Sequence, residues 1–124
     1  AVRLEPGSVL AIPLAWGDLD MAASGTVTDV LPDGRVLAFG HAMNNQGTIA
    51  LPMATGFVHF VLPSIQTSFK MGGSGIIRGA LIRDEAVGIV GSPAGTFSSA
   101  PVRVAVKVPS RTRATNTKSS TTAR

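Results

Sequence analysis

The sequence has no cysteine, only one tryptophan, and charged residues at just 15% of its 124 positions. Without cysteine, the chain has no disulfide framework, no thiolate nucleophile and no cysteine-ligated zinc or iron–sulfur site. No apolar run approaches the ~18 residues that a spanning helix needs, so we expect no transmembrane segment. The missing cysteines alone leave both the cytosol and the cell exterior open as locations.

The positive charge is confined to one part of the chain. The formal net charge is +4, but residues 1–109 contain seven basic and seven acidic side chains and are neutral on balance. The remaining cations lie in residues 110–124, which have no acidic residue and no large apolar side chain. We therefore predict a disordered basic tail there. Since this tail has no aromatic residue for base stacking, no specific nucleic-acid partner is expected.

Short apolar runs separated by turn residues predict an all-β domain over residues 1–109. Fourteen glycines and eight prolines argue against a helical bundle. Turn residues recur about every ten positions, as they do in antiparallel β domains. We predict a small antiparallel barrel or sandwich of roughly six to eight strands.

The clearest predicted hairpin turns at Pro32-Asp33-Gly34, between strands at 20–31 and 35–40. Proline presets φ for the first turn residue, and glycine tolerates a positive φ. The strand predicted at 8–16 contains Pro13, so we expect an edge strand or a bulge there.

The second half of the chain is predicted from the same signals, with residues 64–71 as either a short helix or a loop. The valines of residues 101–109 alternate with smaller or charged side chains, which predicts a half-exposed strand. The other expected elements are strands at 48–53, 56–62, 76–82 and 86–90 and turns at 72–75 and 83–85.

His41 is the first candidate for chemistry. It follows a predicted strand and Gly40 and precedes a polar loop, where a rigid scaffold can present a general base. A lone histidine at a strand end is also commonly an ordinary hydrogen-bonding loop residue. His59 alternates with apolar neighbours and is interpreted as a satisfied strand residue. Because two histidines lack a third ligand, we expect no metal site and no cofactor.

Ser74 and Ser92 are the candidate nucleophiles, because each follows a glycine. A serine on a tight glycine turn allows backbone N–H groups to converge on an oxyanion. Glycine–serine turns are also common for ordinary reasons. The acids that could orient His41 are Asp18, Asp20, Asp33 and Asp84, and nothing in the sequence chooses among them.

Several segments resemble the SpoIVB-type sporulation serine peptidases and their bacterial relatives. The similarity covers roughly residues 4–108 and is strongest in Val36-Leu37-Ala38-Phe39-Gly40-His41, with further likeness in Trp16-Gly17-Asp18-Leu19 and Leu51-Pro52-Met53. The resemblance implies a chymotrypsin-like β architecture, present here as a half or single barrel. It also implies an extracytoplasmic location and serine endopeptidase activity on a peptide or protein substrate.

The resemblance implies a clear general base but only a weak nucleophile. His41 occupies the Gly-His position and is the implied general base. The family's nucleophile lies in a Gly-x-Ser-Gly-Ser-Pro motif far downstream, whereas Gly72-Gly73-Ser74-Gly75 keeps only part of that motif. Ser74 is therefore a weaker candidate, since one short hairpin can hardly supply both sides of a two-barrel cleft.

Two explanations of the missing motif stay open. Either the chain is the amino-terminal half of a longer domain, or it belongs to relatives that keep the scaffold and the histidine without the catalytic serine. The alternative function is a catalytically inactive β module that binds a peptide or protein partner, for instance by strand addition at an open edge.

Overall fold

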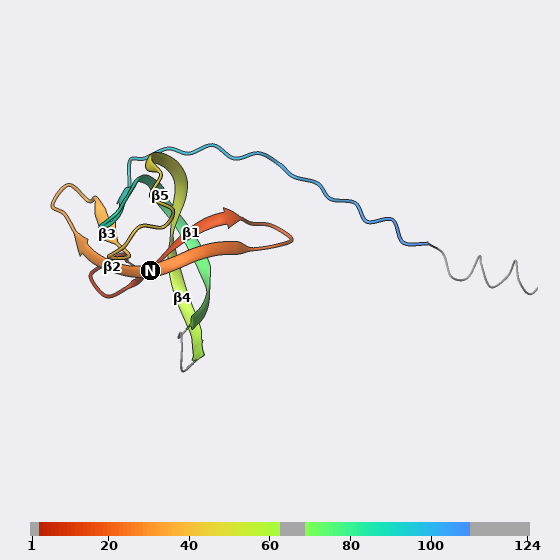
Figure 1. The fold of residues 1–124 in the computed structure, drawn as a ribbon, viewed down its shortest axis with the longest axis horizontal. Coiled ribbons are helices and arrows are strands. Elements are labelled where there is room, and N and C mark those ends of the chain that lie inside the picture. Colours follow the sequence, from red (N-terminus) through yellow and green to blue (C-terminus); the bar gives the residue numbers. More distant parts are fainter. Residues whose placement is uncertain (1–2, 63–68, 110–124) are drawn as a thin grey trace, which may run out of the picture.

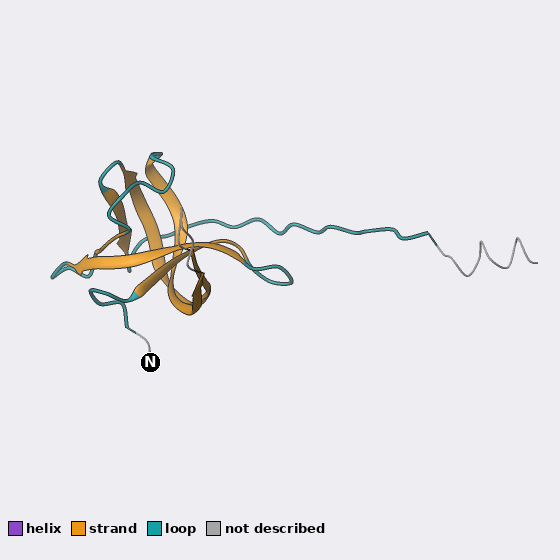
Figure 2. Cartoon of the chain, turned by 60° about the horizontal axis from the view of Figure 1, so that its bottom comes forward, coloured by secondary structure: helices purple, strands orange, loops and turns teal. Residues whose placement is uncertain are grey.

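The structure is a computed structural model that describes residues 3–62 and 69–109. Within these ranges it contains six strands and no helix (Figures 1 and 2), and therefore no helix that could cross a membrane. The strands are β1 (Val9–Ala15), β2 (Met21–Val30), β3 (Val36–Ala38), β4 (Gly47–Leu62), β5 (Phe69–Glu85) and β6 (Gly88–Ser92).

The six strands form a closed barrel in the order β1-β2-β3-β6-β5-β4, and every neighbouring pair is antiparallel. The predicted all-β chain with a small antiparallel barrel is therefore confirmed. β1 closes the barrel against β4 through only two residue pairs, Leu10 with Thr55 and Ala11 with Ala54.

Two predictions for the first half of the barrel, the turn at Pro32-Asp33-Gly34 and a bulge at Pro13, are confirmed, whereas the strand predicted at 35–40 is shorter and ends at Ala38. Gly34 has a φ of 90° and donates its N–H to the carbonyl oxygen of Leu31 at 2.9 Å, which closes the β2–β3 turn. The β1–β2 register shifts between Pro13 and Ala15. Proline cannot donate a hydrogen bond to a neighbouring strand, so a bulge at this point is expected.

The predicted turn at residues 72–75 is wrong, because these residues lie inside β5. The glycines in this segment allow β4 and β5 to approach each other closely instead. A side chain at Gly72 would overlap the carbonyl oxygen of Phe57 on β4, and a Cβ at Gly73 would lie 2.9 Å from the Phe57 ring. The predicted strands at 48–53 and 56–62 are likewise joined in one long strand, β4.

The predicted turn at residues 83–85 is also wrong. β5 continues to Glu85, and the chain reverses at residues 86–87. Asp84 points into the protein and is 0% exposed. Asp84 is therefore the buried member of the charged run Arg83-Asp84-Glu85, and not a turn residue.

The segment after β6 does not form the strand predicted at 101–109. Residues 98–109 run away from the barrel without regular secondary structure, and all of them are exposed (Figure 1). A strand needs a hydrogen-bonded neighbour, and none lies beside this segment in the described part of the chain. The predictions for residues 64–68 and 110–124 lie outside the described residues, whereas 69–71 belong to β5.

The core is small and is built around side chains from all six strands. Gly91 of β6 makes room for Met53 of β4, because a side chain at Gly91 would overlap the Met53 sulfur. The buried cluster consists of Leu10, Ile12, Val27, Val36, Ala38, Met53, Leu81 and Ile89.

Candidate functional site

His41 lies three residues beyond the end of β3, after a sharp change in chain direction. Phe39 and Gly40 both have positive φ angles, 74° and 72°. Phe39 is not a glycine, so its backbone is in a sparsely populated conformation of the kind that gathers at functional sites. The imidazole of His41 is exposed and its ring centre lies 5.7 Å from that of Phe39. The predicted placement of this histidine at a strand end is confirmed.

One ring nitrogen of His41 is already engaged. Nδ1 lies 2.8 Å from the carbonyl oxygen of Ala42. A carbonyl oxygen can only accept a hydrogen bond, so Nδ1 carries the proton in the neutral imidazole. Nε2 is then left with its lone pair, which is the form that a general base requires.

Asp84 holds the loop that follows His41. One carboxylate oxygen, Oδ1, accepts the backbone N–H of Met43 at 2.8 Å. The other, Oδ2, accepts those of Asn44 at 2.7 Å and Gln46 at 3.4 Å. A charged acceptor makes the stronger kind of hydrogen bond, so the loop is fixed to the end of β5.

The pKa of Asp84 reflects this arrangement. Burial by itself raises the pKa of the carboxyl group, but the backbone N–H groups of Asn44, Met43, Gln46 and Asn45 outweigh it and lower the pKa below the ordinary value of 3.8. Asp84 therefore stays ionised inside the protein. From the sequence, Asp84 was predicted to lie in a turn and to be one of four acids that could orient His41, and its contacts with the loop were not predicted.

The other acidic candidates lie elsewhere. Asp33 pairs with Arg35 in the β2–β3 turn, with 2.7 Å between Oδ2 and Nε, and the hydrogen bond from the Arg35 backbone lowers the pKa of Asp33. Asp18 and Asp20 lie in the β1–β2 connection, where Asp20 accepts the N–H of Gly17. Within the described residues, no carboxylate is hydrogen-bonded to the His41 ring.

The structure does not bring Ser74 to His41. Ser74 lies within β5 and pairs with Gly56, ten positions along the strand from Asp84. At about 3.3 Å per residue this is roughly 33 Å of strand. Ser92 ends β6, whose other end packs beside Ala38. Neither candidate nucleophile is hydrogen-bonded to the His41 ring, which makes its polar contact with the Ala42 carbonyl instead.

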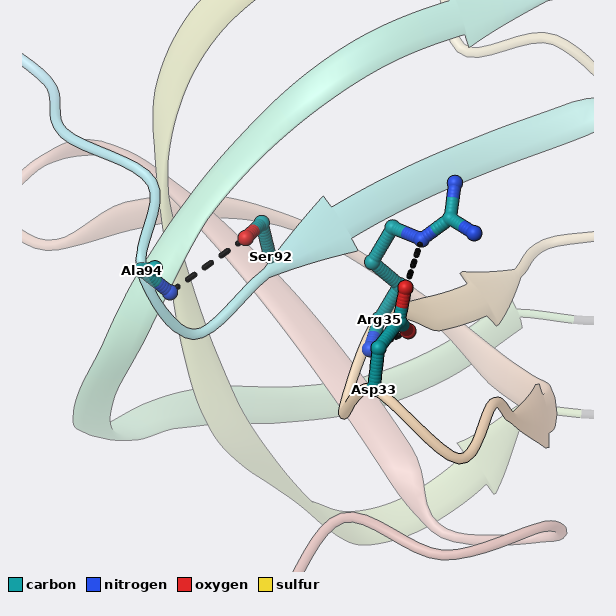
Figure 3. Close-up of polar contacts among 4 residues, drawn as sticks. All are labelled: Asp33, Arg35, Ser92 and Ala94. Atoms are coloured by element: carbon teal, nitrogen blue, oxygen red, sulfur yellow. Dashed lines mark hydrogen bonds and ion pairs between the residues drawn. The ribbon is translucent and has the colours of Figure 1, made fainter.

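A second feature lies at the opposite end of β3. A cavity of about 530 Å³ opens there, where β2 ends and β3 begins. Two polar contacts shape the segments at its mouth (Figure 3): Asp33 with Arg35, and the N–H of Ala94 donated to Ser92 Oγ at 3.3 Å. The cavity is lined by Arg3, Leu4, Val30, Gly34, Val36, Met53, Arg78 and Pro93.

Comparisons of the chain with protein-family models, with curated proteins and with solved structures found no match. Among the described residues, no group of three or more histidine or acidic side chains could hold a metal ion. Function is therefore inferred from the geometry of the His41 loop and from the motifs in the sequence.

Proposed function

We propose that this barrel is the histidine-bearing unit of a SpoIVB-type serine-endopeptidase-like domain, with His41 as the general base. The observation that carries the proposal is the hydrogen bond from His41 Nδ1 to the Ala42 carbonyl. It orients the ring and leaves Nε2 free to take the proton of a serine hydroxyl. The Gly40-His41 motif and the closed antiparallel barrel agree with this role.

The chemistry proposed for this site divides the catalytic groups between two parts of the protein. The barrel supplies the base and the rigid loop behind it. The Ala42 carbonyl takes the place that a carboxylate has in a complete triad, and it stabilises the imidazolium by accepting a hydrogen bond from Nδ1–H. We place the nucleophilic serine in another part of the protein than Ser74 and Ser92, since Ser74 pairs with Gly56 inside β5 and Ser92 ends β6. The substrate is a peptide or protein met outside the cytoplasm.

Active-site labelling tests this proposal. A fluorophosphonate probe applied to the natural full-length protein should label one serine, and His41→Ala should abolish the labelling. His59→Ala is the matched control, because His59 is also exposed but lies on β4, against Phe57; it should label as the wild type does. Absence of labelling in the wild type, or full labelling of His41→Ala, would contradict the proposal.

A second function is favoured by an open strand edge. β5 pairs with β6 only from Ala80 to Glu85, so residues 72–78 have β4 as their one paired neighbour in the described part of the chain. Ile76 on this stretch is 60% exposed. An unpaired edge with apolar side chains is a surface to which an extended peptide can add as a further strand.

The two functions respond differently to substitution. If the barrel binds extended peptides, Ile76→Lys should weaken binding to an array of extended hexapeptides, because a charge on an edge strand opposes strand addition. His41→Ala should leave that binding unchanged. Val87→Lys is the matched control, since Val87 is exposed in the β5–β6 turn. Equal binding by Ile76→Lys and wild type would exclude this edge.

A further inference from the structure

The β1–β2 hairpin extends beyond the barrel and has an open strand edge (Figure 1). β2 pairs with β1 from Met21 to Thr26, whereas β3 pairs with β2 only from Val27 to Val30. Residues 21–25, the outer edge of β2, therefore have β1 as their one paired strand in the described part of the chain. An open edge of this kind accepts a further strand.

Alternate residues of the outer edge present backbone groups to solvent. The carbonyl oxygen of Thr26 accepts the N–H of Phe39, so the backbone groups of Thr26 face away from β1. In a strand the N–H and C=O of one residue point to one side, and those of the next residue point to the other. Ala22 and Ser24 therefore point outward as Thr26 does, and both are exposed.

A segment with a strand pattern but no neighbour leaves the barrel beside this hairpin. The ring of Phe97 lies edge to face on that of Trp16, with 6.3 Å between the ring centres. Both views show the hairpin and the segment after β6 leaving the barrel in the same direction (Figures 1 and 2). The segment at residues 101–109 has four valines that are 77–84% exposed: Val102, Val104, Val106 and Val108.

Charge favours the outer edge of β2 over the open edge of β5 as the acceptor of this segment. Arg103 and Lys107 alternate with the valines. Asp18 and Asp20 lie at the turn of the hairpin and are exposed, whereas the charged residues of β5 ahead of Asp84 are all basic. Opposite charges on neighbouring strands attract, and like charges repel.

Apolar side chains at the end of the hairpin match the valines. Leu14 and Trp16 are each 47% exposed, Met21 is 55% exposed and Leu19 is 71% exposed. Burying such side chains against valines removes apolar surface from water. The hairpin and the segment are thus complementary in charge, in apolar surface and in free backbone groups.

We propose that two copies of this chain exchange strands, so that residues 101–109 of each copy add to the outer edge of β2 in the other. A two-fold axis satisfies both contacts at once, because each copy has one donor segment and one acceptor edge. The backbones of Ala22 and Ser24 bond to the added strand, and the two acids of the hairpin turn face its two cations. The barrel is closed without the added strand, so dilution separates the copies without unfolding them.

Sedimentation and amide exchange test the pairing on the full 124-residue chain. Sedimentation should show a monomer–dimer equilibrium, and exchange at the amides of Ala22 and Ser24 should slow as the concentration rises. The proposal is overturned by a chain that stays monomeric at millimolar concentration, or by a dimer in which these two amides are not slowed. Slowing that is independent of concentration would place the segment on its own hairpin and would also overturn it.

Proline variants test the donor and the acceptor separately. Ala22→Pro removes an outward N–H without removing a hydrogen bond to β1, and an edge strand tolerates proline at such a position. Val104→Pro combined with Ala105→Pro removes the N–H that faces β2, because adjacent residues face opposite sides. Each variant should raise the dimer dissociation constant at least tenfold. Ser98→Pro is the matched control, since it precedes the valines in the same exposed segment; it should stay within twofold.

Charge reversal separates specific pairing from general repulsion. Arg103→Glu combined with Lys107→Glu lowers the positive net charge of the chain, which reduces repulsion between copies, yet it should weaken dimerisation at least tenfold. Asp18→Lys combined with Asp20→Lys should weaken it similarly. All four substitutions together should restore dimerisation to within about threefold of wild type. Undiminished dimerisation of either pair of substitutions, or no recovery in the fourfold variant, would refute the proposed contacts.

Discussion

Replacing Asp84 with asparagine exchanges one carboxylate oxygen for an amide nitrogen inside the protein. The carboxylate accepts two short backbone hydrogen bonds, at 2.8 Å from Met43 and 2.7 Å from Asn44. Whichever way the new amide turns, its NH₂ group faces one of these N–H donors. A hydrogen bond to a charged group contributes about 1.5–3 kcal/mol, and an unsatisfied buried donor costs about 1–3 kcal/mol. We therefore expect Asp84→Asn to lower the free energy of unfolding by about 2–4 kcal/mol.

Urea denaturation at pH 7 measures this loss, and amide hydrogen exchange locates it. Exchange should accelerate at Met43 or Asn44 in Asp84→Asn, since one of these two N–H groups loses its acceptor and the other keeps only a neutral amide oxygen. Asp18→Asn is the matched control, because Asp18 is exposed; its effect should stay within about 0.5 kcal/mol.

The pH dependence gives a second signature. The pKa of Asp84 is lowered in the folded protein, so its contribution is complete well above pH 3.8 and is lost as the pH falls through the folded-state pKa. Wild type should lose stability with acid below about pH 4, and Asp84→Asn should lack that component. Equal stability and an equal acid response in both proteins would refute the reasoning.

Four further predictions test the packing of the barrel. Gly91→Ala should destabilise it by about 1–3 kcal/mol in thermal or chemical denaturation, because the added methyl group overlaps the Met53 sulfur. Thr55→Val should cost about 1–2 kcal/mol in the same assay, since Thr55 Oγ1 accepts the N–H of Ile76 at 3.0 Å. Val27→Ala should cost about 2 kcal/mol and Val104→Ala about zero, because Val27 is 1% exposed and Val104 is 81% exposed. Phe97→Ala should alter the fluorescence of Trp16, the only tryptophan, since the two rings lie edge to face at 6.3 Å.

Local signals in the sequence were sufficient to predict the β2–β3 turn and the bulge in β1. Pro32-Asp33-Gly34 and Pro13 act through their own φ angles and missing hydrogen-bond donors, which a sequence shows directly. His41 was placed correctly for a similar reason, because a short apolar run before it and a polar loop after it identify the end of a strand. These features depend on few distant residues.

Distant contacts decided the features that were predicted wrongly. Glycines mark turns and also places where two backbones approach closely, and only the position of Phe57 shows which applies at Gly72 and Gly73. The buried environment of Asp84 is made by N–H groups about forty residues earlier in the chain. A charged run resembles a turn until those donors are known.

A period-two pattern of apolar residues can also predict a strand wrongly when no neighbouring strand is there to pair with it. Residues 101–109 alternate as a strand does, yet the described barrel offers them no neighbour. The separation of Ser74 from His41 has the same origin, because the path of β5 depends on its register with β4. Neither can be derived from spacing along the chain.

The two-pair junction between β1 and β4 has a consequence for how the barrel opens. It joins segments more than forty residues apart with fewer hydrogen-bonded pairs than the β4–β5 hairpin has, and such non-local closures form late and break early. We expect sub-global unfolding to start at this junction. Opening there would uncover Leu10 and Ala54, both 0% exposed in the closed barrel. It would also expose two strand edges with unpaired backbone N–H and C=O groups to other chains. The junction is thus the point at which self-association during folding would begin.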